Sequence, residues 1–261
     1  MPLFTACSED EGTDIGNDSQ ATVTLYSFAA EAPYDGDCDV VVRVAANSAT
    51  SEAYALAETK EAKLNRVAEL GAEGYNDYVI ENGEKLEDIK GASCQDKVFT
   101  GLTGDNVITV VAVNGSYKKA AEINFTGINW VTVATGTYTF GVPSIQQIYA
   151  SSIATTLQYR ADDPDTYRFK NLFGAGKHLT FTKTQYTYPD GALVCRVAPQ
   201  STSLSYGNYG GINVRDVATW QGSDNYLDCA LYEDGSFYAW VQYYVQAGSL
   251  GYEYDEFTPA E

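Results

Sequence analysis

The sequence lacks most of the residues on which enzymes and metal proteins rely. Its 261 residues include a single histidine, His178. One imidazole excludes a multi-histidine metal site and leaves little for histidine-based acid–base catalysis. No nucleophile–base arrangement is visible around His178, so we expect it to be a structural or surface residue in a strand. The chain is therefore predicted to be non-catalytic and to hold no cofactor.

Basic residues are also scarce. Lys and Arg number 16 against 35 Asp and Glu, which gives a formal net charge of −19. Such a surface repels phosphate backbones, so nucleic acid is excluded as a partner, and plain electrostatic binding to anionic lipid is disfavoured. Long apolar runs are missing too, since none approaches the roughly 18 residues of a membrane-spanning helix.

The stretch "ADDPD" at 161–165 groups Asp162, Asp163 and Asp165. Clustered carboxylates can hold calcium, which prefers oxygen ligands. The stretch lacks a twelve-residue loop that ends in glutamate, and Asp-Pro-Asp is ordinary turn chemistry. We therefore predict a turn, with the three aspartates as weak metal candidates.

The five cysteines show no metal-binding C-x-x-C spacing. Cys195 and Cys229 each alternate with apolar residues along a predicted strand. An exported protein can oxidise such a pair. Two alternatives stay open, a disulfide between them or two thiols in the core.

Strand patterns dominate what is present. In the first half of the chain they cover 21–28, 37–48, 51–58 and 96–128, and the last of these ranges contains a predicted turn at Asn114-Gly115. Residues 58–83 instead place Leu64, Val67 and Leu70 at helical spacing, and Gly71 separates this helix from a second short one. The first half is therefore predicted to be a β-domain with a helical insertion.

The stretch "VFTGLTGDNVITVVAV" (98–113) resembles the E strand, glycine–leucine turn and F strand of fibronectin type III-like domains. Ile108 stands where that family has its F-strand tyrosine, and no tryptophan appears in the B strand. The resemblance implies a divergent fibronectin III or immunoglobulin-like sandwich over residues 21–128.

The same resemblance bears on Cys38 and Cys94. In this fold the start of strand B faces the end of strand E, whereas Cys94 precedes strand E. We therefore expect the two cysteines to lie too far apart for a disulfide, unless the loop 91–95 folds back.

Residues 129–261 contain short strands separated by turn residues every 8–15 positions, which predicts a second antiparallel β-sandwich or barrel. Asp234-Gly235 is a hairpin signal within this half. Trp240 alternates with Tyr238 and Gln242, which places it in the core or on a sheet face.

The opening "LFTACSEDEGTDIGND" (3–18) has small residues before Cys7 and acids directly after it. It resembles the lipobox and acidic export tag of surface lipoproteins of the Bacteroidetes. The stretch "DTYRFKNLFGAGKHLTF" (165–181) also resembles the C-terminal β-domains of these lipoproteins. The resemblance implies a lipid anchor on Cys7, a tether within 1–20, and an outer-membrane protein that faces the cell exterior. The alternative is an ordinary N-terminus with an incidental cysteine.

The stretch "SLSYGNYGGINV" (203–214) holds the candidate ligand-binding residues Tyr206, Asn208 and Tyr209, and Trp220 follows it. Exposed aromatic rings stack on the C–H faces of sugars, and an amide can hydrogen-bond their hydroxyl groups. The alternative is a glycine-rich turn over which the aromatic side chains pack.

The resemblance to surface lipoproteins implies a function in glycan capture, in some members beside an outer-membrane nutrient transporter. We therefore expect a non-catalytic binding module for extracellular glycans. The alternative is a module for adhesion or for contact with another surface protein, which should expose a broad apolar patch or a sheet edge.

Overall fold

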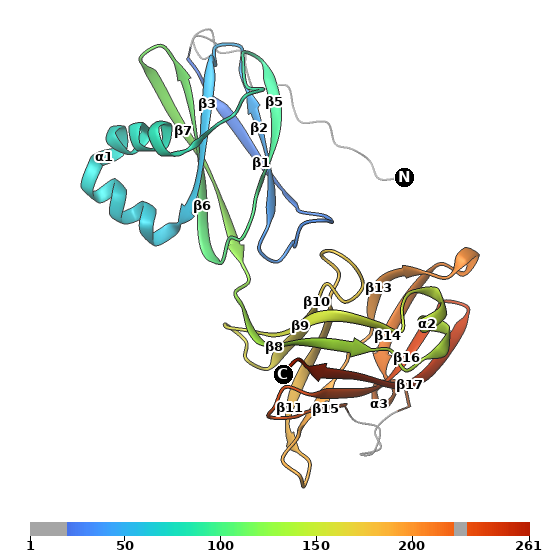
Figure 1. Cartoon of the computed structure of the whole chain (residues 1–261). Coiled ribbons are helices and arrows are strands. Elements are labelled where there is room, and N and C mark those ends of the chain that lie inside the picture. The colour runs from blue at the N-terminus through green and yellow to red at the C-terminus, as the bar shows by residue number, and fades with distance from the viewer. Residues whose placement is uncertain (1–19, 222–228) are drawn as a thin grey trace. The chain divides into compact units, whose positions relative to one another are not determined.

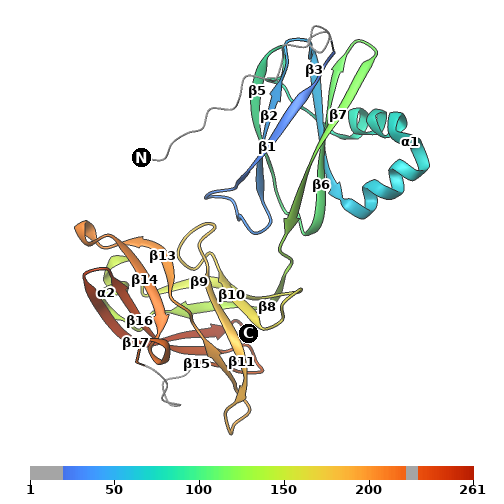
Figure 2. The same ribbon diagram turned by 180° about the vertical axis from the view of Figure 1, so that it is seen from behind.

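The computed structural model describes residues 20–221 and 229–261, except for the side chains of Trp220 and Gln221. Cys7 and the expected tether up to residue 19 lie outside the described residues. The described chain divides into two compact units (Figures 1 and 2). The first contains Gly36–Gly127 and the residues up to Ala30, and the second contains Glu31–Asp35 and Ile128–Glu261.

Two antiparallel sheets make up the first unit, with strand orders β1-β2-β5 and β4-β3-β6-β7 (Figure 1). Their bounds are β1 Val23–Ala29, β2 Val40–Ala46, β3 Glu52–Thr59, β4 Glu84–Lys85, β5 Ser93–Phe99, β6 Gly104–Asn114 and β7 Tyr117–Gly127. Alternate side chains of the two sheets, such as Val42 from β2 and Val110 from β6, meet in the core between them.

The apolar run in β6 is buried on both of its faces. Ile108 and Val110 face the opposite sheet, whereas Val111 packs beneath the helix on the outer face. A strand covered on both sides reads as a continuous apolar run rather than an alternating one. The turn after this strand has Gly115 at φ 59°, as expected for the Asn114-Gly115 hairpin signal.

The helix α1 (Lys60–Asn82) is the insertion between β3 and β4. Gly71 has φ 71°, which breaks the helix into two halves at the predicted residue. Tyr75 and Val79 of the second half are buried against Val111. The helix therefore covers the outer face of the four-stranded sheet.

The second unit is built on a closed barrel in which each strand pairs with the next in the order β16-β15-β12-β11-β10-β9-β8-β17, and β17 pairs with β16 (Figures 1 and 2). The bounds are β8 Trp130–Thr139, β9 Ser152–Arg160, β10 Thr166–Lys170, β11 Leu179–Thr187, β12 Leu193–Arg196, β13 Gln200–Ser205, β14 Gly211–Asp216, β15 Cys229–Leu231, β16 Phe237–Val245 and β17 Gly248–Pro259. The short helices are α2 Pro143–Ile148, η1 Gly207–Tyr209 and α3 Val217–Gln221.

The β13–β14 hairpin attaches to the barrel through β16. That strand pairs with β17 along one edge, and its other edge pairs with β15 at Phe237–Tyr238 and with β14 at Val241–Tyr244. The barrel interior is aromatic, with Phe181 and Phe237 ring centroids 4.5 Å apart. Inward side chains fill the barrel, so it is a packed core rather than a pore.

The all-β prediction is confirmed, and the second half adopts the barrel among its two predicted architectures. The register also separates Cys38 from Cys94, as expected. Cys94 lies opposite Ala45 in β2, seven residues beyond Cys38, which amounts to about 20 Å of strand. Of the helices in the described residues, none is both long and apolar enough to cross a membrane.

Candidate functional site

Two tyrosines form a stacked pair at the tip of the β13–β14 hairpin. The ring centroids of Tyr206 and Tyr209 lie 5.5 Å apart, and the ring planes differ by 21°. The two residues are 40% and 62% exposed, respectively. The rings therefore pack on each other rather than in the barrel core, and the pair is open to solvent.

The local sequence explains this arrangement. Gly207 and Gly210 have φ values of 47° and 88°, which side chains other than glycine rarely adopt. The Tyr209 N–H donates to the Tyr206 carbonyl and the Tyr206 N–H donates to the Gly210 carbonyl, each at 2.9 Å. This tight turn brings two tyrosines three residues apart onto one side of the tip.

The other two candidate residues differ in position. Asn208 lies between the tyrosines and is exposed, so its amide is available beside the pair. Trp220 lies in α3, which begins after β14 ends at Asp216. Because the six residues of β14 span about 20 Å, Trp220 belongs to the other end of that strand. The structure therefore brings together three of the four candidates.

The acidic turn between β9 and β10 uses its carboxylates for local contacts. Each has a protein partner: Asp162 with Arg160 (2.8 Å), Asp163 with Thr166 Oγ1 (2.7 Å) and Asp165 with Lys183 (3.1 Å). Each of the three carboxylates is therefore held by a local contact of the turn rather than facing a shared metal position.

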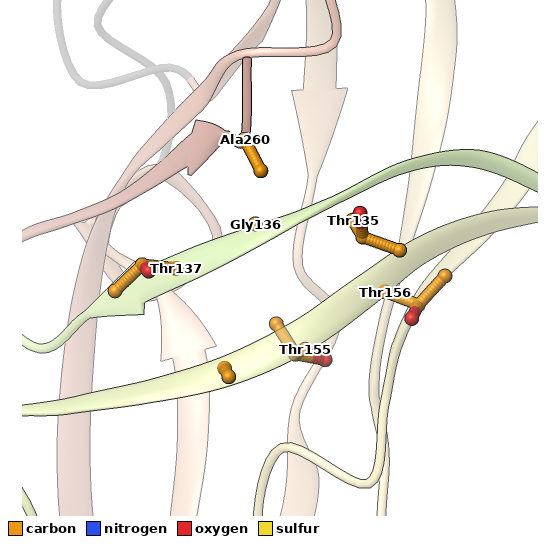
Figure 3. A pocket seen from close by; sticks show the side chains of 7 residues that line it. Thr135, Gly136, Thr137, Thr155, Thr156 and Ala260 are labelled. Atoms are coloured by element: carbon orange, nitrogen blue, oxygen red, sulfur yellow. The ribbon is translucent and has the colours of Figure 1, made fainter.

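A shallow hollow of about 460 Å³ lies over β8 and β9 (Figure 3). The side chains that line it are small: Thr135, Gly136, Thr137, Ala154, Thr155, Thr156 and Ala260. The polar side-chain groups of the hollow are threonine hydroxyls, and none of these residues is ionisable. The hollow therefore offers hydrogen bonds but no acid, base or nucleophile of low pKa.

A buried arginine forms a cluster that sequence reasoning missed. Arg168 in β10 is 1% exposed. Its Nε donates to Gln158 Oε1 and its Nη2 donates to Asp35 Oδ2, both at 2.9 Å. Its guanidinium carbon lies 4.3 Å from the centroid of the Trp130 ring. A carboxylate, an amide and an aromatic face together satisfy the buried cation.

His178 completes this cluster. Its Nδ1 accepts the Asn171 backbone N–H at 2.9 Å, so the ring proton resides on Nε2, which lies 3.3 Å from Asp35 Oδ1. Burial alone would raise the pKa of Asp35. The hydrogen bonds from His178 and Arg168, with the charge of Arg168, outweigh burial and hold that pKa well below its usual range. The only histidine of the chain therefore has a structural contact.

A second buried carboxylate lies inside the barrel. Asp255 Oδ2 accepts hydrogen bonds from the hydroxyls of Tyr243 at 2.6 Å and Tyr138 at 3.0 Å. Its Oδ1 accepts the Gly141 backbone N–H at 2.8 Å. Burial raises the pKa of Asp255 to about 7, although these three donors oppose the rise. The side chain is fully enclosed, so it has no access to a substrate.

Cys195 and Cys229 lie directly opposite each other on β12 and β15, and both are buried. Opposed residues of an antiparallel pair have the Cα spacing that a disulfide requires. Burial raises the pKa of the Cys195 thiol to about 12, so as a thiol it is a poor nucleophile. The structure has both residues as core thiols rather than as a disulfide, although their spacing would allow one.

Comparisons with known proteins add little to this geometry. No family profile and no characterised protein matches the chain. Among solved structures, a mutant of Kfla1895 in complex with cyclobis-(1→6)-α-nigerosyl is 11% identical, with a TM-score of 0.24. The match covers 87% of this chain and 30% of that one, so the chain spans less than a third of its length. A likeness at this level carries no argument about fold or function.

Proposed function

We propose that this protein is a non-catalytic glycan-binding module and that the Tyr206–Tyr209 pair is its sugar contact. The observation that carries the proposal is the exposure of two stacked rings on a tight turn, in which Asn208 is exposed as well. Tyrosine rings present large apolar faces at low entropic cost, and the amide supplies both hydrogen-bond donors and an acceptor.

The placement of the perturbed carboxylates supports a non-catalytic role. Asp255 is enclosed in the barrel, and Asp35 is saturated by Arg168 and His178. A hydrolase needs an acid and a base that converge on an accessible cleft. The described residues hold these two carboxylates in separate structural clusters instead.

Replacing both Tyr206 and Tyr209 by alanine is expected to weaken binding to a positive polysaccharide at least about tenfold, because two ring–sugar contacts are lost. Affinity electrophoresis in gels that contain laminarin, mannan, xylan or dextran measures the effect. Tyr186→Ala is the matched control, since Tyr186 is 65% exposed on β11 and outside the hairpin. Equal retardation of the double variant and the wild-type protein would place the sugar contact elsewhere.

Adhesion to another protein is the second candidate, and one observation favours it. β1 is an edge strand of its sheet, and its outward residues Tyr26 and Phe28 are 50% and 47% exposed. An exposed edge with apolar side chains can accept a further strand from a partner. This surface belongs to the first unit, so it is independent of the tyrosine pair.

The proposal includes the nature of the two domains and the anchor. The strand orders β1-β2-β5 and β4-β3-β6-β7, with the insertion between β3 and β4, support a divergent fibronectin III-like first domain. We also propose that Cys7 is lipidated and that the protein therefore lies on the outward face of the outer membrane. This proposal rests on the small residues before Cys7 and the acidic residues after it.

The chain is expected to incorporate an alkyne-palmitate label when a bacterium exports it behind a signal peptide without a lipobox of its own. Cys7→Ser is expected to abolish the label, because the acylated thiol is gone. Cys94→Ser serves as the control, since Cys94 is also exposed. In-gel fluorescence after click coupling measures incorporation, and undiminished label on Cys7→Ser would exclude lipidation at Cys7.

A further inference from the structure

The outer face of β16 and β17 is aromatic where a barrel usually exposes polar residues. In β16 the odd-numbered residues such as Ala239 and Val241 are buried in the barrel, so the even-numbered residues face outward. Trp240 lies opposite Tyr254 of β17, and Gln242 lies opposite Tyr252. Aromatic side chains thus occupy outward positions on both strands.

These outward rings form a continuous row. Trp240 lies 4.1 Å from Tyr254 and 6.2 Å from Tyr252, measured between ring centroids. Tyr254 lies 5.6 Å from Tyr238, which lies 6.1 Å from Tyr232. We call these five residues the aromatic row. Tyr252 is 50% exposed, so the row opens to solvent at that residue.

The row contains an indole N–H whose hydrogen-bonding capacity is unused. Trp240 Nε1 is buried and has no hydrogen-bond acceptor among the described residues. A buried donor without an acceptor destabilises the fold, so native structures rarely retain one without reason. A ligand that brings an oxygen acceptor to this N–H would relieve the cost.

The outward face continues from the row toward the tyrosine pair. β14 lies along β16, with Arg215 opposite Gln242 and Asn213 opposite Tyr244. The Arg215 guanidinium carbon lies 4.5 Å from the Tyr244 ring centroid, and its Nε donates to Gln242 Oε1. β14 begins at Gly211, directly after the turn that holds the pair.

We propose that the outer face of β14, β16 and β17 binds an extended polysaccharide chain, of which the Tyr206–Tyr209 pair holds one end. This inference rests on the proposed glycan function and adds the size class of the ligand. Tyr244 lies six positions beyond Tyr238 along β16, about 20 Å, which is room for several consecutive sugar rings. Each ring of a sugar polymer has an apolar C–H face for the aromatic side chains and hydroxyl oxygens that can accept from Trp240 Nε1.

Titration calorimetry with laminarin, mannan, xylan and dextran, and with the partial hydrolysates of each down to the disaccharide, tests the proposal. The wild-type chain is expected to bind at least one polymer about tenfold more tightly than the disaccharide of the same sugar. Tyr252→Ala and Trp240→Phe are expected to remove most of this length dependence while disaccharide binding persists. Trp240→Phe keeps a ring and removes the N–H, so its effect isolates the donor.

Tyr26→Ala is the matched control, because Tyr26 is as exposed as Tyr252 but lies on β1 of the first unit. Circular dichroism of each variant establishes that it is folded. Binding that does not depend on chain length, or row variants that bind polymers like the wild type, would overturn the extended site and leave the glycan function intact. Loss of all sugar binding in the Tyr206→Ala/Tyr209→Ala variant would support the glycan function at the tyrosine pair. If the wild-type chain binds no sugar, both the glycan function and the extended site are overturned.

Discussion

Replacing Asp35 by alanine is expected to destabilise the second unit by about 3–5 kcal/mol, because Arg168 would then remain buried without its carboxylate. The Nη2–Oδ2 distance of 2.9 Å and the 1% exposure of Arg168 place this ion pair in the interior. Most of the loss reflects the desolvated guanidinium that Asp35→Ala leaves behind, not the net value of the pair. The double variant Asp35→Ala/Arg168→Met, which removes both charges and keeps an apolar side chain of similar length to arginine, is expected to cost less.

Urea denaturation followed by tryptophan fluorescence measures this effect selectively. All three tryptophans, Trp130, Trp220 and Trp240, belong to the second unit, so their emission reports on that unit. The surface pair Arg43–Asp96 is the control, because it also joins a guanidinium to both oxygens of a carboxylate but has side chains that are nearly half exposed. Asp96→Ala is expected to change the midpoint little, since solvent screens such pairs.

The pH dependence provides a further check on Asp35. Its pKa is lowered in the folded state, so the stabilisation is present above the unfolded pKa of about 4 and is lost as pH falls through the lower folded value. The difference between the wild-type chain and Asp35→Ala should therefore shrink below about pH 4. An Asp35→Ala chain that unfolds at the wild-type midpoint at pH 7 would mean that Arg168 is not held by this carboxylate.

Asp255→Asn is expected to change how the stability of the second unit depends on pH. Burial raises the folded pKa of Asp255 to about 7, whereas the unfolded value is about 4. Between these values the unfolded chain has released the proton that the folded chain retains. The free energy of unfolding therefore falls as pH rises from about 4 to about 7, by up to about 4 kcal/mol, and asparagine removes this fall.

Urea denaturation at half-unit steps between pH 4 and pH 8 measures the free energy of unfolding of Asp255→Asn and of the wild-type chain. The contributions of the other acids cancel in the difference between the two. Tyr138→Phe is an informative second variant, because loss of one donor should raise the folded pKa of Asp255 further and extend the fall in stability to higher pH. Parallel curves for Asp255→Asn and the wild-type chain over this range would show that Asp255 keeps an ordinary pKa.

The sequence predicted local features well because their causes are local. The break of α1 at Gly71 and the hairpin at Asn114-Gly115 each follow from a glycine with positive φ. The pairing of Tyr206 with Tyr209 likewise depends on a turn of three residues. Trp220 lies close to them in the sequence, but the intervening six-residue strand β14 separates it from the tip.

The polar clusters could not be predicted because their partners lie far apart in the chain. Arg168 is 133 residues from Asp35, and Asp255 is 117 residues from Tyr138. In the sequence each of these acids is one of 35, and no local pattern distinguishes an inward carboxylate from a solvated one. Only closure of the barrel, which pairs β8 with β17, places Asp255 beside Tyr138 and Gly141.

The glycan function is best tested by a glycan-array screen of the 261-residue chain carrying Cys7→Ser. We expect reproducible binding to at least one glycan class, and loss of that binding in the Tyr206→Ala/Tyr209→Ala variant on the same array. An array without any hit, from protein that is folded by circular dichroism, would contradict the glycan function and favour a protein partner for the exposed edge of β1.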